Sequence, residues 1–248
     1  MNFLCDFHLH SCLSPCGSLD MSPTAMARAA KAAGLDAIAL TDHNSALNTP
    51  AFAAACRNEG LHALFGMEVN TLEEIHCLAL FETPEAALAF GALLFDHLPD
   101  FRNIPEKIGD QVVVNEHEEV LQQVSRYLGG ATDIPFSQLP ARVDAHGGLF
   151  IPAHIDRPGC GVLAKLGRIP PESGPVLGVT RFQLQALRDR LEPDYTLVTF
   201  SDAHYLNDIG RAATRIETDT FSLASIRKAL LAHRAIPVLR PETSRSHS

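Results

Sequence analysis

The feature that most constrains this chain is a series of short apolar runs, each followed by or ending in a motif rich in histidine and acid. Five motifs recur along the 248 residues: His8-Leu9-His10, Thr41-Asp42-His43-Asn44, Gly66-Met67-Glu68 with His76 downstream, Ala153-His154-Ile155-Asp156-Arg157, and Ser201-Asp202-Ala203-His204. Apolar runs without polar alternation are typical of buried parallel strands. A barrel gathers the carboxyl ends of its strands at one face, so we expect the motifs to meet there. Because imidazole and carboxylate bind divalent metals, the sequence predicts a metal centre.

Helix signals alternate with these runs, and together they predict an α/β fold with a mostly parallel sheet. Ser22-Pro23, Thr49-Pro50 and Thr83-Pro84 each place a capping residue before proline, as helix starts do. We expect strands over residues 2–7, 37–40, 61–65, 75–81, 149–153, 176–179 and 197–200. We expect helices after each of those three starts and over residues 136–145, 181–191 and 223–232.

The stretch from Pro99 to Thr132 interrupts the alternation. It holds the run Val112–Val114 and a predicted helix over Glu116–Leu128. We therefore expect one barrel domain over residues 1–240, with an insertion or lid near 99–132 and a disordered tail over 241–248. With 46% hydrophobic residues, the chain can bury one large core, and a barrel of this length is commonly a single domain.

Composition narrows the classes of partner. The net charge of −9 argues against binding duplex nucleic acid, although a small anionic substrate is compatible with it. No apolar stretch is long enough to cross a bilayer, and Asp6 and His8 interrupt any signal peptide, so we expect no membrane partner. Six cysteines without a small-scaffold pattern predict reduced thiols and a cytoplasmic location. The oligomeric state is left open.

Single motifs have ordinary alternatives. Residues i and i+2 of a strand point to one face, so His8 and His10 can share a metal, but two unrelated surface histidines would look the same. Burying the carboxylate of Glu68 would cost free energy unless a metal or an arginine neutralises its charge. His76 alone would be read as a core histidine. The coordinated set favours metal binding.

The five motifs, in this order and over almost the whole chain, resemble those of the PHP (polymerase and histidinol phosphatase) superfamily. The resemblance implies a distorted (βα)7, TIM-like barrel with a bi- or trinuclear metal site at the carboxyl ends of its strands. It implies two or three divalent ions as cofactors, with zinc, manganese and iron all compatible with these ligands. It assigns the first ion to His8, His10, Glu68 and Asp202. It assigns the second to Glu68, His76 and His154, and the third to His43 and His204.

The third site departs from the family pattern. Many relatives carry an Asp or His a few residues beyond the HxH motif, and here Cys16 falls at that place. We therefore include Cys16 among the predicted metal ligands. Two alternatives stay open: the pattern also fits Cys12 and Cys16 as small buried hydrophobes, and Asp20 is a further candidate oxygen ligand.

The chemistry that follows is hydrolysis of a small phosphate ester, such as a phosphomonoester, a nucleotide or a short oligonucleotide. Adjacent metals can bridge a water, generate hydroxide at neutral pH and clamp phosphate oxygens. We predict Asp202 or His204 as proton carriers and Arg157 as a phosphate clamp, with Lys165 and Arg168 as further cations or plain surface. Alternatives are a hydrolase of another ester or an amide, a nuclease, and a non-catalytic metal-binding regulatory module.

Overall fold

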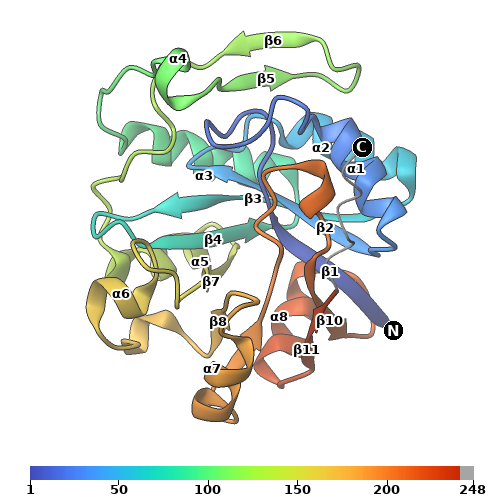
Figure 1. Ribbon diagram of the computed structural model, residues 1–248, viewed down its shortest axis with the longest axis vertical. Helices are drawn as coiled ribbons and strands as arrows, with labels where there is room; N and C mark the ends of the chain where they lie inside the picture. The colour runs from blue at the N-terminus through green and yellow to red at the C-terminus, as the bar shows by residue number, and fades with distance from the viewer. Residues whose placement is uncertain (241–248) are drawn as a thin grey trace, which may run out of the picture.

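The computed structural model describes residues 1–240, and the predicted disordered tail over 241–248 lies outside them. Seven strands form one curled sheet in the order β11-β10-β1-β2-β3-β4-β7 (Figure 1). They are β1 (Asn2–Leu9), β2 (Ala37–His43), β3 (His62–Asn70), β4 (His76–Phe81), β7 (Leu149–Pro152), β10 (Ala212–Glu217) and β11 (Ala235–Leu239). The parallel pair β8 (Val176–Gly178) and β9 (Thr196–Val198) lies between the two edges, with β8 beside β7 and β9 beside β11.

The sheet is mixed, and the prediction of a mostly parallel sheet is therefore wrong. β1, β2 and β3 are parallel, but β4 is antiparallel to β3 and β7, and β10 is antiparallel to β1 and β11. The segment 71–75 that joins β3 to β4 holds no helix, and a parallel pair needs a much longer crossover. As a consequence β4 begins where β3 ends, and His76 lies opposite Asn70.

Two apolar layers follow from the alternation of side chains along the strands. Phe3, Cys5 and Phe7 of β1 face a cluster that also receives residues from β2, β3, β4, β7, β8, β9 and β10, which is the barrel interior. Leu4 of β1 and Leu40 of β2 belong to a second cluster, beneath the helices. The barrel is therefore filled by side chains and is not a pore.

Helices surround the sheet (Figure 1). They are α1 (Pro23–Ala32), α2 (Thr49–Glu59), α3 (Pro84–Asp96), α4 (Pro105–Ile108), α5 (Leu139–Ala145), α6 (Val162–Leu166), α7 (Leu184–Leu191) and α8 (Leu223–Leu231). Two of the three capping signals act as predicted, because the side chains of Ser22 and Thr83 accept hydrogen bonds from the first turns of α1 and α3. Thr49 is instead the first residue of α2, and Asn48 before it makes no side-chain capping bond. None of the helices in residues 1–240 is long and apolar enough to span a membrane.

The 99–132 segment forms a hairpin of β5 (Val112–Val114) and β6 (Val120–Gln123), so the predicted helix over Glu116–Leu128 is wrong. Asn115 turns the chain, because its side-chain oxygen accepts hydrogen bonds from the backbone of His117 and Glu119. Such local bonds compete with helix formation. The sequence also gave no sign of β10 and β11.

Candidate metal centre

The predicted ligands from the two ends of the chain meet because the Ser201–His204 motif pairs with the end of β1. Leu9 and Ala203 form a parallel bridge, and the backbone N–H of His10 donates to Ala203 at 3.0 Å. The imidazoles of His8 and His10 approach each other, with their Nε2 atoms 3.1 Å apart. Oδ1 of Asp202 lies 3.4 Å from Nε2 of His8 and 3.2 Å from Nε2 of His10.

Buried Asp6 fixes this register. Its carboxylate accepts backbone hydrogen bonds from Ser201 and Gly210, each at 2.9 Å, on either side of the motif. Burial raises the pKa of Asp6 to about 6, although these hydrogen bonds act in the opposite direction. Asp6 is thus a positioning residue that ties the late motif to the first strand.

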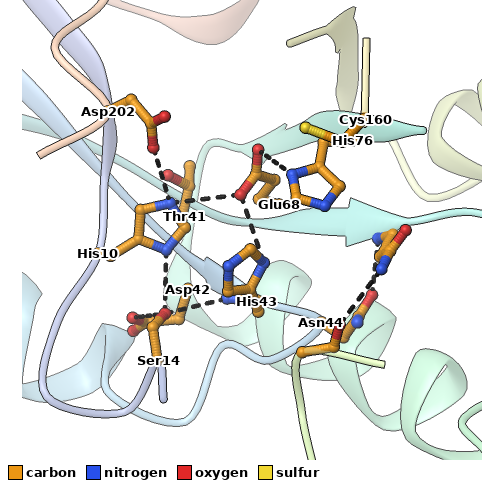
Figure 2. A network of polar contacts seen from close by, with 12 residues as sticks. His10, Ser14, Thr41, Asp42, His43, Asn44, Glu68, His76, Cys160 and Asp202 are labelled. Atoms are coloured by element: carbon orange, nitrogen blue, oxygen red, sulfur yellow. Dashed lines mark hydrogen bonds and ion pairs between the residues drawn. The ribbon is translucent and has the colours of Figure 1, made fainter. Parts of the chain in front are cut away.

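Glu68 of β3 lies at the centre and is 1% exposed (Figure 2). Strand register delivers its neighbours, because His43 of β2 lies opposite Glu68, and the start of β4 brings in His76. Around Oε1 lie Nε2 of His8 at 3.2 Å, Nδ1 of His76 at 3.0 Å and Nε2 of His154 at 2.9 Å. Around Oε2 lie Nε2 of His10 and Nδ1 of His43, both at 3.3 Å. One carboxylate thus contacts five imidazoles.

All nine predicted ligands fall into overlapping groups whose donor atoms lie within 4.8 Å of one another. The groups are His8, His10, Glu68 and Asp202; His43, Glu68 and His76; His10, Cys16, His43 and His204; and His76 and His154 with Cys160. The structure therefore brings together all nine predicted ligands, plus Cys160, which was not predicted.

The donor set fits divalent metal ions. Nδ1 of His43 and Oδ1 of Asp202 are buried and make no hydrogen bond within residues 1–240. Burial would raise the pKa of Glu68, but the surrounding histidines hold it well below its usual value. Burial would likewise lower the pKa of His10 and His76, yet Asp202 and Glu68 raise the pKa of His10 to about 10, and Glu68 and Cys160 raise that of His76 to about 10. Two charged carboxylates thus require positive charge here, and divalent ions would take the place of these protons.

Asp42 orients His10 through a serine, as Figure 2 shows. The Asp42 carboxylate accepts from the hydroxyl of Ser14 and the backbone of Ser11, each at 2.7 Å. Because the Ser14 O–H donates its hydrogen bond to Asp42, the Ser14 oxygen is left to accept a hydrogen bond from Nδ1 of His10 at 3.0 Å. Nε2 of His10 is then left to face the carboxylates, as a metal ligand requires.

Two of the predicted ligands have an unusual backbone conformation. His154 has a φ of 28° and Asp202 a φ of 53°, a region that residues other than glycine rarely occupy and that recurs at functional sites.

The Ala153–Arg157 motif also makes two side-chain contacts. Arg157 forms an ion pair with Asp202. Asp156 accepts a hydrogen bond from the backbone of Thr180 at 2.8 Å, and so fixes the loop after β8 beside the motif.

Cys16 lies within reach of His10, His43 and His204. Cys12 instead lies buried, with its thiol 3.6 Å from the carbonyl of Val112. Asp20 belongs to none of the donor groups found in residues 1–240 and lines a separate groove.

The sequence interpretation missed Cys160. Its sulfur lies 3.9 Å from Nδ1 of His154, and its carbonyl accepts from the backbone of His76 at 3.1 Å. The chain folds back tightly here, and glycine is needed at 161 because a Cβ at that position would lie only 2.5 Å from the carbonyl oxygen of Ile155. The only signal was a cysteine followed by glycine, six residues after a predicted ligand. The two further cations that the sequence offered do not join the donor groups. Lys165 forms an ion pair with Glu74 at 2.6 Å, and Arg168 is exposed.

Comparison with known families identifies the fold. The model of the PHP domain matches residues 6–146, more than half of the chain, and the PHP-associated model matches residues 195–235. The chain belongs to the PHP domain family. The predicted family is confirmed. No curated protein matches the sequence significantly.

Solved structures support the distorted, TIM-like PHP barrel. The lesion-specific endonuclease Q of Pyrococcus furiosus has a TM-score of 0.68 and 17% identity, over 94% of this chain and 56% of that one. A two-domain protein of Bacteroides vulgatus, described as containing a predicted PHP-like metal-dependent phosphoesterase, has a TM-score of 0.57 and 19% identity, over 97% of this chain and 65% of that one. The PHP chain thus spans little more than half the length of endonuclease Q. At such identities the likeness shows the fold.

One prediction is contradicted. The sequence interpretation excluded duplex nucleic acid as a partner, but endonuclease Q in complex with a 27-mer duplex carrying an abasic lesion matches with a TM-score of 0.66 and 16% identity, over 94% of this chain and 57% of that one. The error lay in using the net charge of −9, a sum over the whole chain. Local cations matter for binding an anion, and Arg157 and Arg181 both line the cavity beside the predicted ligands His8, His154 and Asp202.

Proposed function

We propose that the PHP chain hydrolyses phosphate esters with two or three divalent metal ions held by the nine predicted ligands. The observation that carries this proposal is the central place of Glu68, whose two oxygens contact five imidazoles at 2.9–3.3 Å. A single tetrahedral ion accepts four ligands, so this set is too large for one ion. A shared carboxylate between adjacent ions is the simplest use of the geometry.

Bound divalent ions would lower the pKa of a water and neutralise phosphate oxygens. Arg157 complements them from the mouth of the site. Its side chain is 40% exposed and pairs with Asp202, so it reaches both the buried carboxylate and a substrate that enters from solvent. A guanidinium binds two phosphate oxygens at once, which suits the role of clamp.

Asp202 and His204 are proposed as proton carriers. Burial lowers the pKa of His204 to about 4, and the neighbouring histidines hold the pKa of Asp202 well below its usual value in spite of burial. Both groups are therefore unprotonated at neutral pH and accept a proton before they pass it to the leaving oxygen. Nδ1 of His204 donates to the carbonyl of Asp202 at 2.8 Å, which leaves Nε2 with its lone pair for a metal or a proton.

The proposed substrate is a small phosphate ester. A phosphodiester within DNA is the second candidate, favoured by the fold shared with the endonuclease Q complex. Zinc, manganese and iron are the proposed metals, because histidine and carboxylate suit each of them.

We also propose a single domain over residues 1–240, with the 99–132 segment as a wall or lid. Asn44 supports this, because its amide donates to the carbonyls of Leu128 and Gly130 at 2.7 and 2.9 Å. Asn48 likewise donates to Val112 at 3.0 Å. The insertion is thus tied to the residues beside His43.

A cytoplasmic location is supported by six cysteines that form no disulfide.

A panel of phosphomonoesters, nucleotides, short oligonucleotides and duplex DNA, assayed with each metal, tests this function. Release of inorganic phosphate identifies a monoesterase, and strand cleavage identifies a nuclease. An absence of turnover on every ester, with metals shown to be bound, would refute the proposal and favour a non-catalytic module.

Arg157→Ala tests the phosphate clamp. We expect normal metal content and a kcat/KM lower by roughly 30-fold to 150-fold, since a charge-assisted bidentate contact is worth about 2–3 kcal/mol. Arg28→Ala is the matched control, because Arg28 pairs with Glu59 on the surface. Unchanged kinetics in Arg157→Ala would remove this residue from the site.

A further inference from the structure

Phe182 is the most exposed large hydrophobic side chain in residues 1–240, at 78%. Single exposed hydrophobic residues are common and need no explanation by themselves. The position of this ring is the unusual feature. Phe182 and its neighbour Arg181 line the same cavity as His8, His154 and Asp202.

The loop that carries Phe182 is fixed by the metal-site motif itself. Asp156 lies two residues after His154 and accepts hydrogen bonds from both the backbone and the hydroxyl of Thr180. Thr180 directly precedes Arg181 and Phe182. The motif that supplies a predicted ligand therefore also determines where the exposed ring lies.

The ring has a cation beside it. The guanidinium carbon of Arg181 lies 4.6 Å from the centroid of the Phe182 ring. Arg157 lines the same cavity and forms its ion pair with Asp202 there. An aromatic surface and two guanidinium groups thus border the entrance to the metal ligands.

The size of the cavity limits which part of a substrate can enter it. Its volume is about 70 Å³, which is room for only a few water molecules. A phosphate group can enter next to the ligands, but a larger organic group must stay at the rim. Phe182 is the aromatic side chain that is exposed at that rim.

We propose that Phe182 and Arg181 form a platform that stacks the nucleobase of the substrate. The ligand would be a base-bearing phosphate ester, either a nucleotide or a nucleotide within a single strand. Every base offers a π face to an aromatic ring, and an arginine adds attraction to the base and to phosphate. This inference rests on the proposed phosphoesterase function and specifies its substrate class.

Equilibrium binding tests the platform without turnover. The full chain, with a chelator present, is titrated with a labelled five-nucleotide DNA strand and with an abasic strand of the same length; thymidine 5′-monophosphate serves as a competitor. The quantity of interest is the ratio of the two affinities, because the backbone charge is common to both strands. Competition by the mononucleotide would indicate that one base suffices, and its absence would assign the platform to strands.

Phe182→Ala should lower the affinity for the base-bearing strand by about 5-fold to 150-fold, the range measured for one stacked base, and bring the ratio close to one. Phe182→Trp should keep the ratio or raise it. Phe101→Ala is the matched control, since Phe101 is 50% exposed on the insertion, and should keep the parent ratio.

Three results would overturn the inference: a parent ratio close to one, a parent chain that binds neither strand, and an unchanged ratio in Phe182→Ala. The proposed function fails by a different measurement, namely no hydrolysis of any ester by the metal-loaded parent. Base stacking in an inactive chain would retain the platform and reject the phosphoesterase.

Discussion

The two ends of the candidate metal centre each carry a cysteine, and the two thiols have opposite properties. At one end Cys16 lies near His10, His43 and His204, and at the other Cys160 lies near His76 and His154. Burial raises the pKa of Cys16 to about 12, and the charges of nearby carboxylates add to this. Burial would raise the pKa of Cys160 as well, but the two histidines beside it lower the value to about 6.

The comparison teaches that neighbours, and not residue type or burial, decide what a cysteine can do in this site. Cys16 is an exposed residue and Cys160 is half-buried, and both lie close to the same group of predicted ligands. The largest charge effects on Cys16 come from the carboxylates of Glu68 and Asp202, whereas those on Cys160 come from His154 and His76, whose own pKa values are raised to about 9 and about 10. A thiolate there is stabilised by adjacent positive charge, and thiolate is the form that binds metals and reacts with electrophiles.

The largest expected effect comes from removing the residue that serves both ends. Glu68→Gln should lower the metal content from more than one ion per protomer to near zero, because one carboxylate contacts five ligands across both groups. Elemental analysis after gel filtration measures it. Glu59→Gln, a partly exposed carboxylate paired with Arg28, is the control and should keep its metals. Full metal content in Glu68→Gln would show that the two ends bind independently of it.

The next effect separates the two thiols directly. In chelator-treated protein Cys160 should react with iodoacetamide at least roughly tenfold faster than Cys16 at pH 7.5. The Cys160 rate should rise with pH up to about 6 and then level off, since its pKa is about 6 and the thiolate dominates above that value. The Cys16 rate should keep rising throughout, since its pKa is about 12.

Mass spectrometry of the alkylated peptides gives the alkylation rates of both cysteines, and the fast alkylation should be absent in Cys160→Ser. Zinc should protect Cys160 if its sulfur is a ligand. Equal rates for the two cysteines would contradict the contrast between the ends.

The smallest expected effect concerns metal preference at the Cys16 end. Cys16→Asp should shift the competition between zinc and manganese towards manganese, on the order of fivefold, because one soft sulfur is replaced by a hard oxygen. The ratio of bound metals after equilibration with both measures this shift. An unchanged ratio would mean that Cys16 contributes no ligand, and the other ligand groups would be unaffected.

Much of the site follows from local sequence, because the alternation of side chains along a strand is a local property. His8 and His10 lie two apart at the end of one strand, and Glu68 ends another, so their meeting requires only that neighbouring strands align. The capping residues Ser22 and Thr83 begin helices for equally local reasons. These features were predicted, and the structure contains them.

Tertiary structure decided the rest, because it depends on contacts between distant residues. The short 71–75 connection made β4 antiparallel, which turned the first residue of a strand, His76, into a neighbour of Glu68. Cys160 and Phe182 gained their positions only when loops folded back onto the ligand motif, through Gly161 and Asp156. The sequence by itself determined which residues can bind a metal, whereas loop closure decided which thiol and which ring lie beside it.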